Sequence, residues 1–147
     1  KYTPVDDTLI PTGEIASVEG TVLDFRTPHV IGERVKTLDD TATIGYDHNF
    51  VVNGEAGEMR PVAKLKDPKS GRVLEVKSVE PGVQFYSGNF LKGQAGKGGK
   101  EYPHRSAICL ETQHYPDSPN QPQFPSTTLK PGEVYSSTTI HKFSVQK

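Results

Sequence analysis

The clearest structural signal in the chain is RPVAKLKDPKSGRVLEVKSV, at residues 60–79. Two runs in which apolar and polar side chains alternate, 60–66 and 72–79, flank the sequence DPKSG. Alternation is typical of a strand with one buried face, and the apolar positions on that face are Ala63, Leu65, Leu74 and Val76. Asp, Pro, Ser and Gly are residues that tight turns prefer. The stretch therefore predicts a β-hairpin with its turn at residues 68–71.

Other apolar runs predict further strands on both sides of this hairpin. They lie at residues 18–25, 47–52, 83–87, 107–111 and 134–145. Gly and Pro are abundant, with 14 and 12 residues, and turns rich in them separate most of the runs. No segment has a sustained 3.6-residue apolar period, so little helix is expected. We therefore predict an all-β fold, an antiparallel β-sandwich.

Composition restricts the partners and the compartment. The length of 147 residues fits one domain. The formal net charge is −1 and no long basic run is present, which makes nucleic acid and anionic membranes poor candidates for partners. No apolar stretch approaches the roughly 18 residues of a membrane span, and a cytoplasmic protein is expected. The one cysteine, Cys109, lies in an apolar run and is interpreted as a small buried side chain.

Three polar residues stand at strand starts or inside apolar runs, and they are Asp47, Gln84 and Glu111. Glu111 follows an apolar run and precedes a Pro-rich segment, a position that can hold one acid/base group steady. Each residue taken alone fits a solvated or hydrogen-bonded structural role. On neighbouring strands of one sheet, two carboxylates and an amide would line a concave face and suit sugar hydroxyls. The five histidines show no metal-ligand spacing, so no metal site is predicted.

Three motifs of the chain resemble a known family. GYDHNF at 45–50, PGVQFYSGNFL at 81–91 and LETQHYPDSPNQP at 110–122 look like those of the aldose 1-epimerases, the galactose mutarotase family. The resemblance extends over essentially the whole chain, but only to the C-terminal portion of the family. It implies a galactose mutarotase-like supersandwich of antiparallel strands. Residues 1–147 would form about its C-terminal half, with the N-terminal part absent from this chain.

The resemblance also implies an activity, the interconversion of the α and β anomers of free aldohexoses such as galactose and glucose. By motif position, Glu111 matches the general base that takes the proton of the anomeric hydroxyl. Asp47 and Gln84 match positions that bind sugar hydroxyls. A histidine acid protonates the ring oxygen, the ring opens, the C1–C2 bond rotates and reclosure gives the other anomer, without a cofactor. In the family that acid lies in the N-terminal portion, and none of the five histidines here matches it.

Three functions stay open at this point. The first is the C-terminal chain of an aldose 1-epimerase, inactive alone, packed against a second polypeptide that carries the N-terminal portion. The second is a non-catalytic carbohydrate-binding β-sandwich fragment, and the third is a purely structural β-domain. A partner chain with histidines opposite Glu111 would distinguish the first from the second. Its interface is expected to be core-like and above about 2,000 Å².

Overall fold

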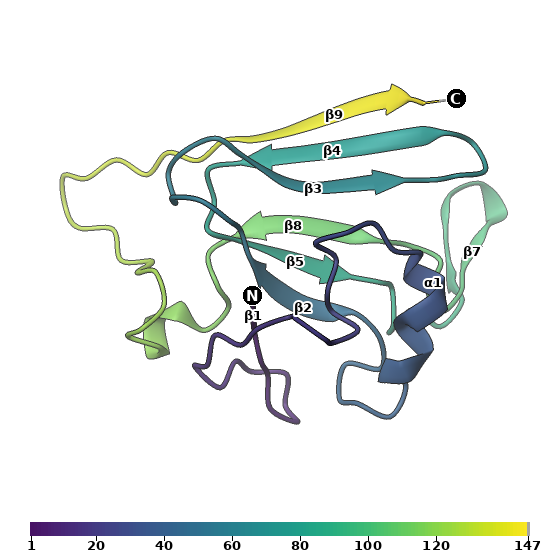
Figure 1. Ribbon diagram of the computed structural model, residues 1–147, viewed down its shortest axis with the longest axis horizontal. Coiled ribbons are helices and arrows are strands. Elements are labelled where there is room, and N and C mark those ends of the chain that lie inside the picture. Colours follow the sequence, from purple (N-terminus) through teal and green to yellow (C-terminus); the bar gives the residue numbers. More distant parts are fainter. Residues whose placement is uncertain (147) are drawn as a thin grey trace. The chain divides into compact units, whose positions relative to one another are not determined.

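The protein, a computed structural model, divides into two compact units, which are described separately (Figure 1). The structure describes residues 1–146. The first unit comprises residues 1–50 and 84–111, and the second comprises residues 51–83 and the chain from residue 112 onward. Strands make up most of the regular structure, and the helices are single turns. The predicted all-β class with antiparallel pairing is confirmed.

The first unit is built on a four-stranded sheet in the order β1-β2-β5-β8. Strand β1 pairs antiparallel with β2, and Tyr2 lies opposite Phe50. A small two-stranded ribbon, β6 with β7, projects from the same unit. The elements are β1 (Tyr2–Thr3), α1 (Ile31–Arg34), η1 (Val35–Leu38), β2 (Asp47–Val51), β5 (Gly82–Tyr86), β6 (Gln94–Ala95), η2 (Lys97–Gly99), β7 (Glu101–Tyr102) and β8 (Cys109–Gln113).

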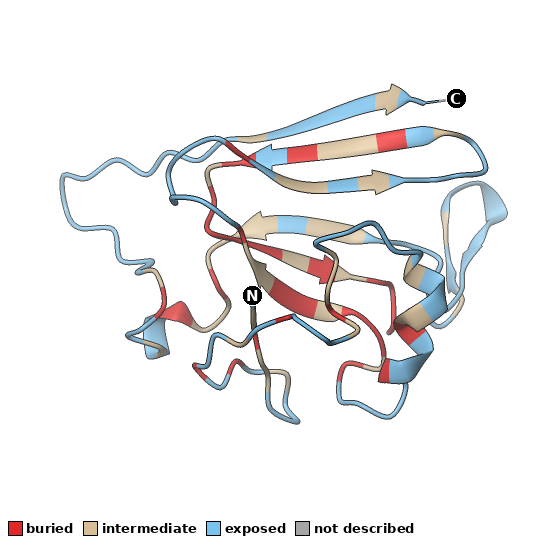
Figure 2. Cartoon of the chain, viewed as in Figure 1, coloured by how far each residue is buried: buried red, intermediate tan, exposed pale blue. Residues whose placement is uncertain are grey.

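Aromatic rings form the core of the first unit. Tyr46 is fully buried and stacks on Phe85 with 5.0 Å between ring centroids, while Phe25 meets both rings edge-on. Leu110 of β8 packs against the same cluster, so one face of the sheet is covered by this core. Burial of each such side chain contributes about 1.5–3 kcal/mol, which makes the cluster the main local source of stability. Figure 2 shows the buried positions along β2 and β5.

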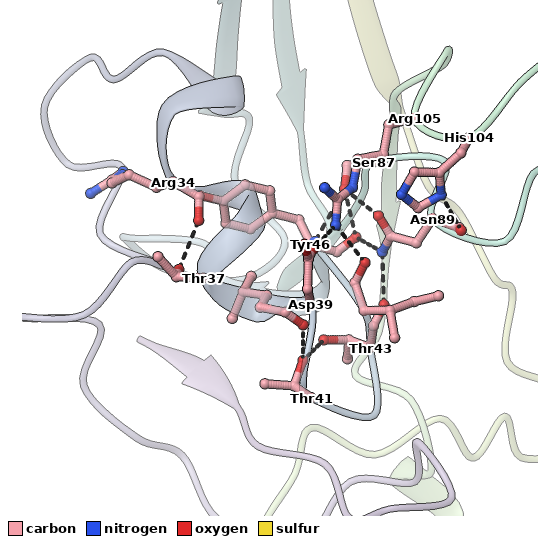
Figure 3. A network of polar contacts seen from close by, with 12 residues as sticks. Arg34, Thr37, Asp39, Thr41, Thr43, Tyr46, Ser87, Asn89, His104 and Arg105 are labelled. Atoms are coloured by element: carbon pink, nitrogen blue, oxygen red, sulfur yellow. Dashed lines mark hydrogen bonds and ion pairs between the residues drawn. The ribbon is translucent and has the colours of Figure 1, made fainter.

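A buried amide fixes the chain where it enters β2 (Figure 3). Asn89 is 2% exposed, and its Nδ2 donates to the carbonyl oxygens of Thr43 at 2.9 Å and Tyr46 at 2.8 Å. The hydroxyl of Ser87 donates to Asn89 Oδ1 at 2.6 Å. Because buried carbonyls must be hydrogen-bonded, this side chain supplies a donor to Thr43 O and a further one to Tyr46 O, which also accepts from the backbone N–H of Ser87 at 3.0 Å.

Gly45 makes this arrangement possible, and its replacement by Ala is expected to lower the free energy of unfolding by about 2–3 kcal/mol. Its φ is +143°, and a Cβ there would lie 2.1 Å from Asn89 Oδ1. Gly20→Ala is the matched control, because Gly20 also has a positive φ but nothing lies within 4 Å of its added Cβ. Urea denaturation of both variants measures the difference. Equal losses would show that the approach of Asn89 has no role.

The second unit is organised by a three-stranded antiparallel sheet in the order β3-β4-β9. The predicted hairpin is confirmed, with Leu65 opposite Leu74 and Ala63 opposite Val76. Asp67 holds the turn, since its carboxylate accepts from the backbone N–H groups of Lys69 and Ser70. The elements are β3 (Arg60–Lys66), β4 (Arg72–Ser78), η3 (Ser118–Asn120) and β9 (Thr139–Val145).

Two of the strand predictions are wrong. Residues 18–25 form turns rather than a strand, since Thr21 N–H bonds to Val18 O and Asp24 N–H bonds to Thr21 O. The last strand begins at Thr139, not at Val134. Side-chain hydrogen bonds of Tyr135 and Ser137 to a buried carboxylate hold the segment before β9 in an irregular conformation. Among residues 1–146, no helix has the length and apolar character needed to cross a membrane.

Candidate functional site

The three candidate residues come from three neighbouring strands of one sheet. Asp47 lies in β2, Gln84 in β5 and Glu111 in β8. Their chain neighbours Tyr46, Phe85 and Leu110 all pack into the aromatic core. Successive side chains of a strand point to opposite faces, so the three polar side chains share the face turned away from that core. This is the common face that sequence reasoning expects.

Asp47 and Gln84 are joined directly. Gln84 Nε2 donates to Asp47 Oδ1 at 2.8 Å, which fixes the orientation of the amide. Gln84 Oε1 is consequently turned away from the carboxylate, and it is buried without a hydrogen-bond partner among the described residues. A buried acceptor without a donor costs about 1–3 kcal/mol. A hydroxyl donor from a bound molecule would remove this penalty.

The two carboxyl groups occupy different environments. Asp47 is half-buried, and burial raises the pKa of its carboxyl above the usual 3.8, while the hydrogen bond from Gln84 acts in the opposite direction. Glu111 is exposed on β8. A half-buried carboxyl bonded to an amide and an exposed carboxyl two strands away are suited to different tasks, the first to binding and the second to proton transfer.

The prediction that Cys109 is a small buried side chain is wrong. The thiol is half-buried, and it lies two residues before Glu111 on the same face of β8. The pKa of the thiol is raised above 9.0, and burial is the largest cause. The charge of Glu111, a hydrogen bond to Glu111 and the charge of Asp47 raise the pKa further. The thiol therefore stays protonated at neutral pH. Because residues two apart on a strand share a face, the spacing from Glu111 is the sequence signal that could have placed Cys109 beside it.

His48 lies on the other face of β2 from Asp47. It is 8% exposed, its ring meets Tyr2 edge-on, and its Nδ1 accepts from the backbone N–H of Asp47 at 3.1 Å. Burial lowers the pKa of the imidazole from 6.5 to about 4. The ring is therefore neutral at pH 7, with its proton on Nε2 because Nδ1 is the acceptor.

The buried neutral imidazole predicts loss of stability in acid. Between pH 6.5 and 4, the unfolded chain binds a proton at His48 that the folded chain does not, so the free energy of unfolding falls as pH falls. The full effect is about 3 kcal/mol. We expect His48→Gln to remove this component, measured as the difference in pH-dependent urea denaturation between variant and wild type. The exposed His29 supplies the control, since His29→Gln should retain the component. An unchanged pH dependence in His48→Gln would contradict the prediction.

The second unit contains a buried carboxylate that the sequence does not reveal. Glu80 is 5% exposed and accepts hydrogen bonds at Oε1 from the hydroxyls of Tyr135, at 3.1 Å, and Ser137. Its Oε2 lies 2.9 Å from Nδ1 of His114, an ionic contact without hydrogen-bond alignment. Three partners from two distant segments make this cluster a structural anchor. A Glu before a Pro-Gly turn normally indicates a solvated position, so no local pattern predicts it.

The described carboxylates, imidazoles and thiol form no group of three that could hold a metal ion. The histidines are dispersed in the structure as they are in the sequence. His48 is buried behind β2, His114 contacts Glu80, and His104 Nδ1 lies 2.8 Å from the carbonyl oxygen of Asn89. Within residues 1–146, no histidine forms a hydrogen bond or ion pair with Glu111.

The structure is that of an antiparallel all-β protein with polar groups on one face of a sheet. Comparison with known proteins shows the family. The family model described as aldose 1-epimerase matches residues 1–142. The chain belongs to the aldose 1-epimerase family.

Named relatives agree with this membership. Galactose mutarotase of Mus musculus is 54% identical over 145 residues, which cover 98% of this chain and 41% of that protein. Aldose 1-epimerase of Escherichia coli is 37% identical over 146 residues, covering 97% of this chain and 42% of that protein. A crystal structure of an aldose epimerase homologue from C. elegans superimposes with a TM-score of 0.87 at 29% identity, covering 99% of this chain and 43% of that one. The chain thus spans about two fifths of the length of these relatives.

Proposed function

We propose that this chain is the C-terminal portion of an aldose 1-epimerase domain that interconverts the α and β anomers of aldohexoses such as galactose and glucose. Glu111 is the general base, and Asp47 and Gln84 bind sugar hydroxyls. The observation that carries the proposal is the hydrogen-bonded Asp47–Gln84 pair, on the same sheet face as Glu111, in which Gln84 Oε1 has no hydrogen-bond partner among residues 1–146. Family membership of residues 1–142 supports it.

The chemistry of this face suits the reaction. Anomerisation removes the proton of the anomeric hydroxyl while another group delivers a proton to the ring oxygen. Glu111 is exposed at the surface of a strand, where a sugar can reach its carboxylate and where the backbone ladder holds it in place. Asp47 accepts from sugar hydroxyls, and Gln84 Oε1 accepts one more, so the ring is oriented with its anomeric hydroxyl toward Glu111.

The ring-oxygen acid lies outside residues 1–147 in this proposal. Support comes from three of the histidines, His48, His104 and His114, whose ring nitrogens contact groups other than Glu111. The acid therefore belongs to the N-terminal portion of the same fold, in the full-length protein or on a second polypeptide. The full-length protein here means the natural polypeptide that contains this chain.

The exposed surface of β9 supports the proposal that a further portion of the fold packs against this chain. This strand pairs with β4, and its other edge has no strand partner in the described part of the chain. Its apolar side chains Ile140, Phe143 and Val145 are 45%, 76% and 63% exposed. Figure 2 shows most of β9 as exposed. A free edge with exposed apolar residues is a surface that proteins normally cover. We infer that the N-terminal portion covers it, through an interface above about 2,000 Å².

A non-catalytic carbohydrate-binding function is the alternative, and the same residues would then bind sugar without turnover. The two functions are separated by the anomeric exchange rate of galactose, measured by NMR with the full-length protein. We expect catalysed exchange, and Gln84→Ala should raise KM about tenfold by removing a hydroxyl partner. Gln94→Ala, on the exposed β6 ribbon, is the control and should not alter KM. Binding without faster exchange would instead establish the alternative.

A further inference from the structure

The first unit contains a cavity that the proposed reaction does not use. Its volume is about 370 Å³, and it opens to solvent between two loops, residues 2–7 and 38–43, with His48 of β2 in its wall. His48 alternates with Asp47 along β2, so this cavity lies on the opposite side of the strand from Asp47, Gln84 and Glu111. The size falls within the range of small-molecule sites, about 300–1,000 Å³.

His48 brings an unpaired donor to this cavity. The side chain is 92% buried, since it is 8% exposed, and Nδ1 already accepts from the N–H of Asp47. The proton is therefore on Nε2, and Nε2–H has no hydrogen-bond partner within residues 1–146. His48 lies in the wall of the cavity, so Nε2–H is available to an acceptor that a bound molecule supplies.

The walls of the cavity are held in place by polar contacts. In the first loop, the carboxylate of Asp6 accepts from the N–H groups of Thr8, at 2.8 Å, and Ile10, at 3.2 Å. The second loop is fixed by Arg105, whose Nη2 donates to Asp39 Oδ1 at 2.5 Å and to the carbonyl oxygen of Ile44 at 2.9 Å (Figure 3). The site is therefore formed before any ligand arrives, which reduces the ordering cost of binding.

The lining selects for hydroxyl groups. Carboxylates of Asp7 and Asp40 offer acceptors, and Tyr2 offers an aromatic ring. The hydroxyl of Thr41 can accept but not donate, because its hydrogen is donated to the carbonyl oxygen of Leu38 at 2.7 Å. Mixed donors, acceptors and an aromatic ring match a molecule that carries several hydroxyls on an aliphatic ring. A cation fits less well, because these groups do not form a metal-binding cluster in the described part of the chain and Nε2 is protonated.

We propose that this cavity binds a small polyhydroxylated molecule, a monosaccharide or cyclic polyol, with Nε2–H of His48 donating to one hydroxyl and Asp40 accepting from another. The site is distinct from the proposed reaction site. It is also one residue away from Asp47, whose N–H is held by the same imidazole. Binding of a ligand in the cavity should therefore change the NMR signal of the His48 ring.

NMR of the full-length protein labelled with ¹⁵N-histidine tests the proposal, with myo-inositol as the first probe and galactose as the second. Myo-inositol has hydroxyls on a ring but no anomeric centre. We expect a saturable change at His48 Nε2 with myo-inositol, at least about tenfold weaker binding in Asp40→Ala, and no change in the control Glu14→Ala, because Glu14 is exposed and outside the cavity.

Glu111→Gln separates the two sites and should leave the His48 response intact. Three results would overturn the proposal. They are the absence of a saturable response with both probes, a response unaffected by Asp40→Ala, and a response that disappears in Glu111→Gln. The last result would assign the response to the reaction site. Asp40 is exposed, so its replacement leaves the fold intact and the outcome interpretable.

Discussion

Replacement of Glu111 by Gln in the full-length protein is expected to lower kcat for galactose anomerisation by at least about 100-fold, because a positioned general base contributes typically 10²–10⁴-fold. The amide keeps the size of the side chain but cannot take the proton of the anomeric hydroxyl. The melting temperature should change little, since Glu111 is exposed and contributes little packing. Rates are measured by polarimetry and stability by calorimetry on the same samples.

Glu101→Gln is the matched control for this experiment. Glu101 is an exposed strand glutamate in β7 of the same unit, and its replacement should leave kcat unchanged. If Glu111→Gln retained more than about a tenth of the wild-type kcat, Glu111 would not be the base. A large fall in melting temperature would instead assign a structural role to the carboxylate.

The largest expected effect on stability is at Arg60, at the start of β3. Its side chain is buried, and its guanidinium donates to six carbonyl oxygens, of which Val79 O also accepts from the backbone N–H of Gly57. The acceptors are Val52, Asn53, Gly54, Glu58, Val79 and Glu80. Arg60→Ala is expected to lower the free energy of unfolding by about 3–5 kcal/mol, because hydrogen bonds to charged groups contribute more than neutral ones and several buried acceptors are left unpaired.

Lys64→Ala, on the same strand, is the control. The Lys64 side chain is 51% exposed and its contact with Glu75 is 3.8 Å long, so its loss should change stability by less than about 1 kcal/mol. Urea denaturation measures both variants. A loss below about 1 kcal/mol in Arg60→Ala would show that water replaces the guanidinium at these carbonyls.

Local patterns predicted the parts of the fold that local chemistry controls. The hairpin of β3 and β4 follows from alternating side chains and from the Asp67 turn, and its two strands and its turn match the prediction. The strands of Asp47, Gln84 and Glu111 are neighbours in one sheet, as the site hypothesis requires, and the roles of the three residues stay a prediction. Strands and turns of this kind depend on the two-residue alternation of side chains and on turn residues close together in the chain, and both can be read from the sequence.

Long-range polar contacts could not be predicted in the same way. Glu80 is bonded to Tyr135 and Ser137, more than 50 positions away, and these bonds keep residues before Thr139 out of β9. The apolar run at 18–25 packs as turns, since Val18 and Leu23 reach the aromatic core without a strand partner. Side chains from distant segments decide such cases, and no period along the chain records them.

Polarimetry of freshly dissolved α-galactose, with residues 1–147 purified free of any other polypeptide, tests the central proposal most directly. That proposal assigns the base to this chain and the ring-oxygen acid to the portion outside it. We predict that the chain alone leaves optical rotation drifting at the rate of buffer, while the full-length protein at the same concentration accelerates it. An isolated chain with the rate of the full-length protein would contradict the proposal, because Glu111 would then act without an external acid.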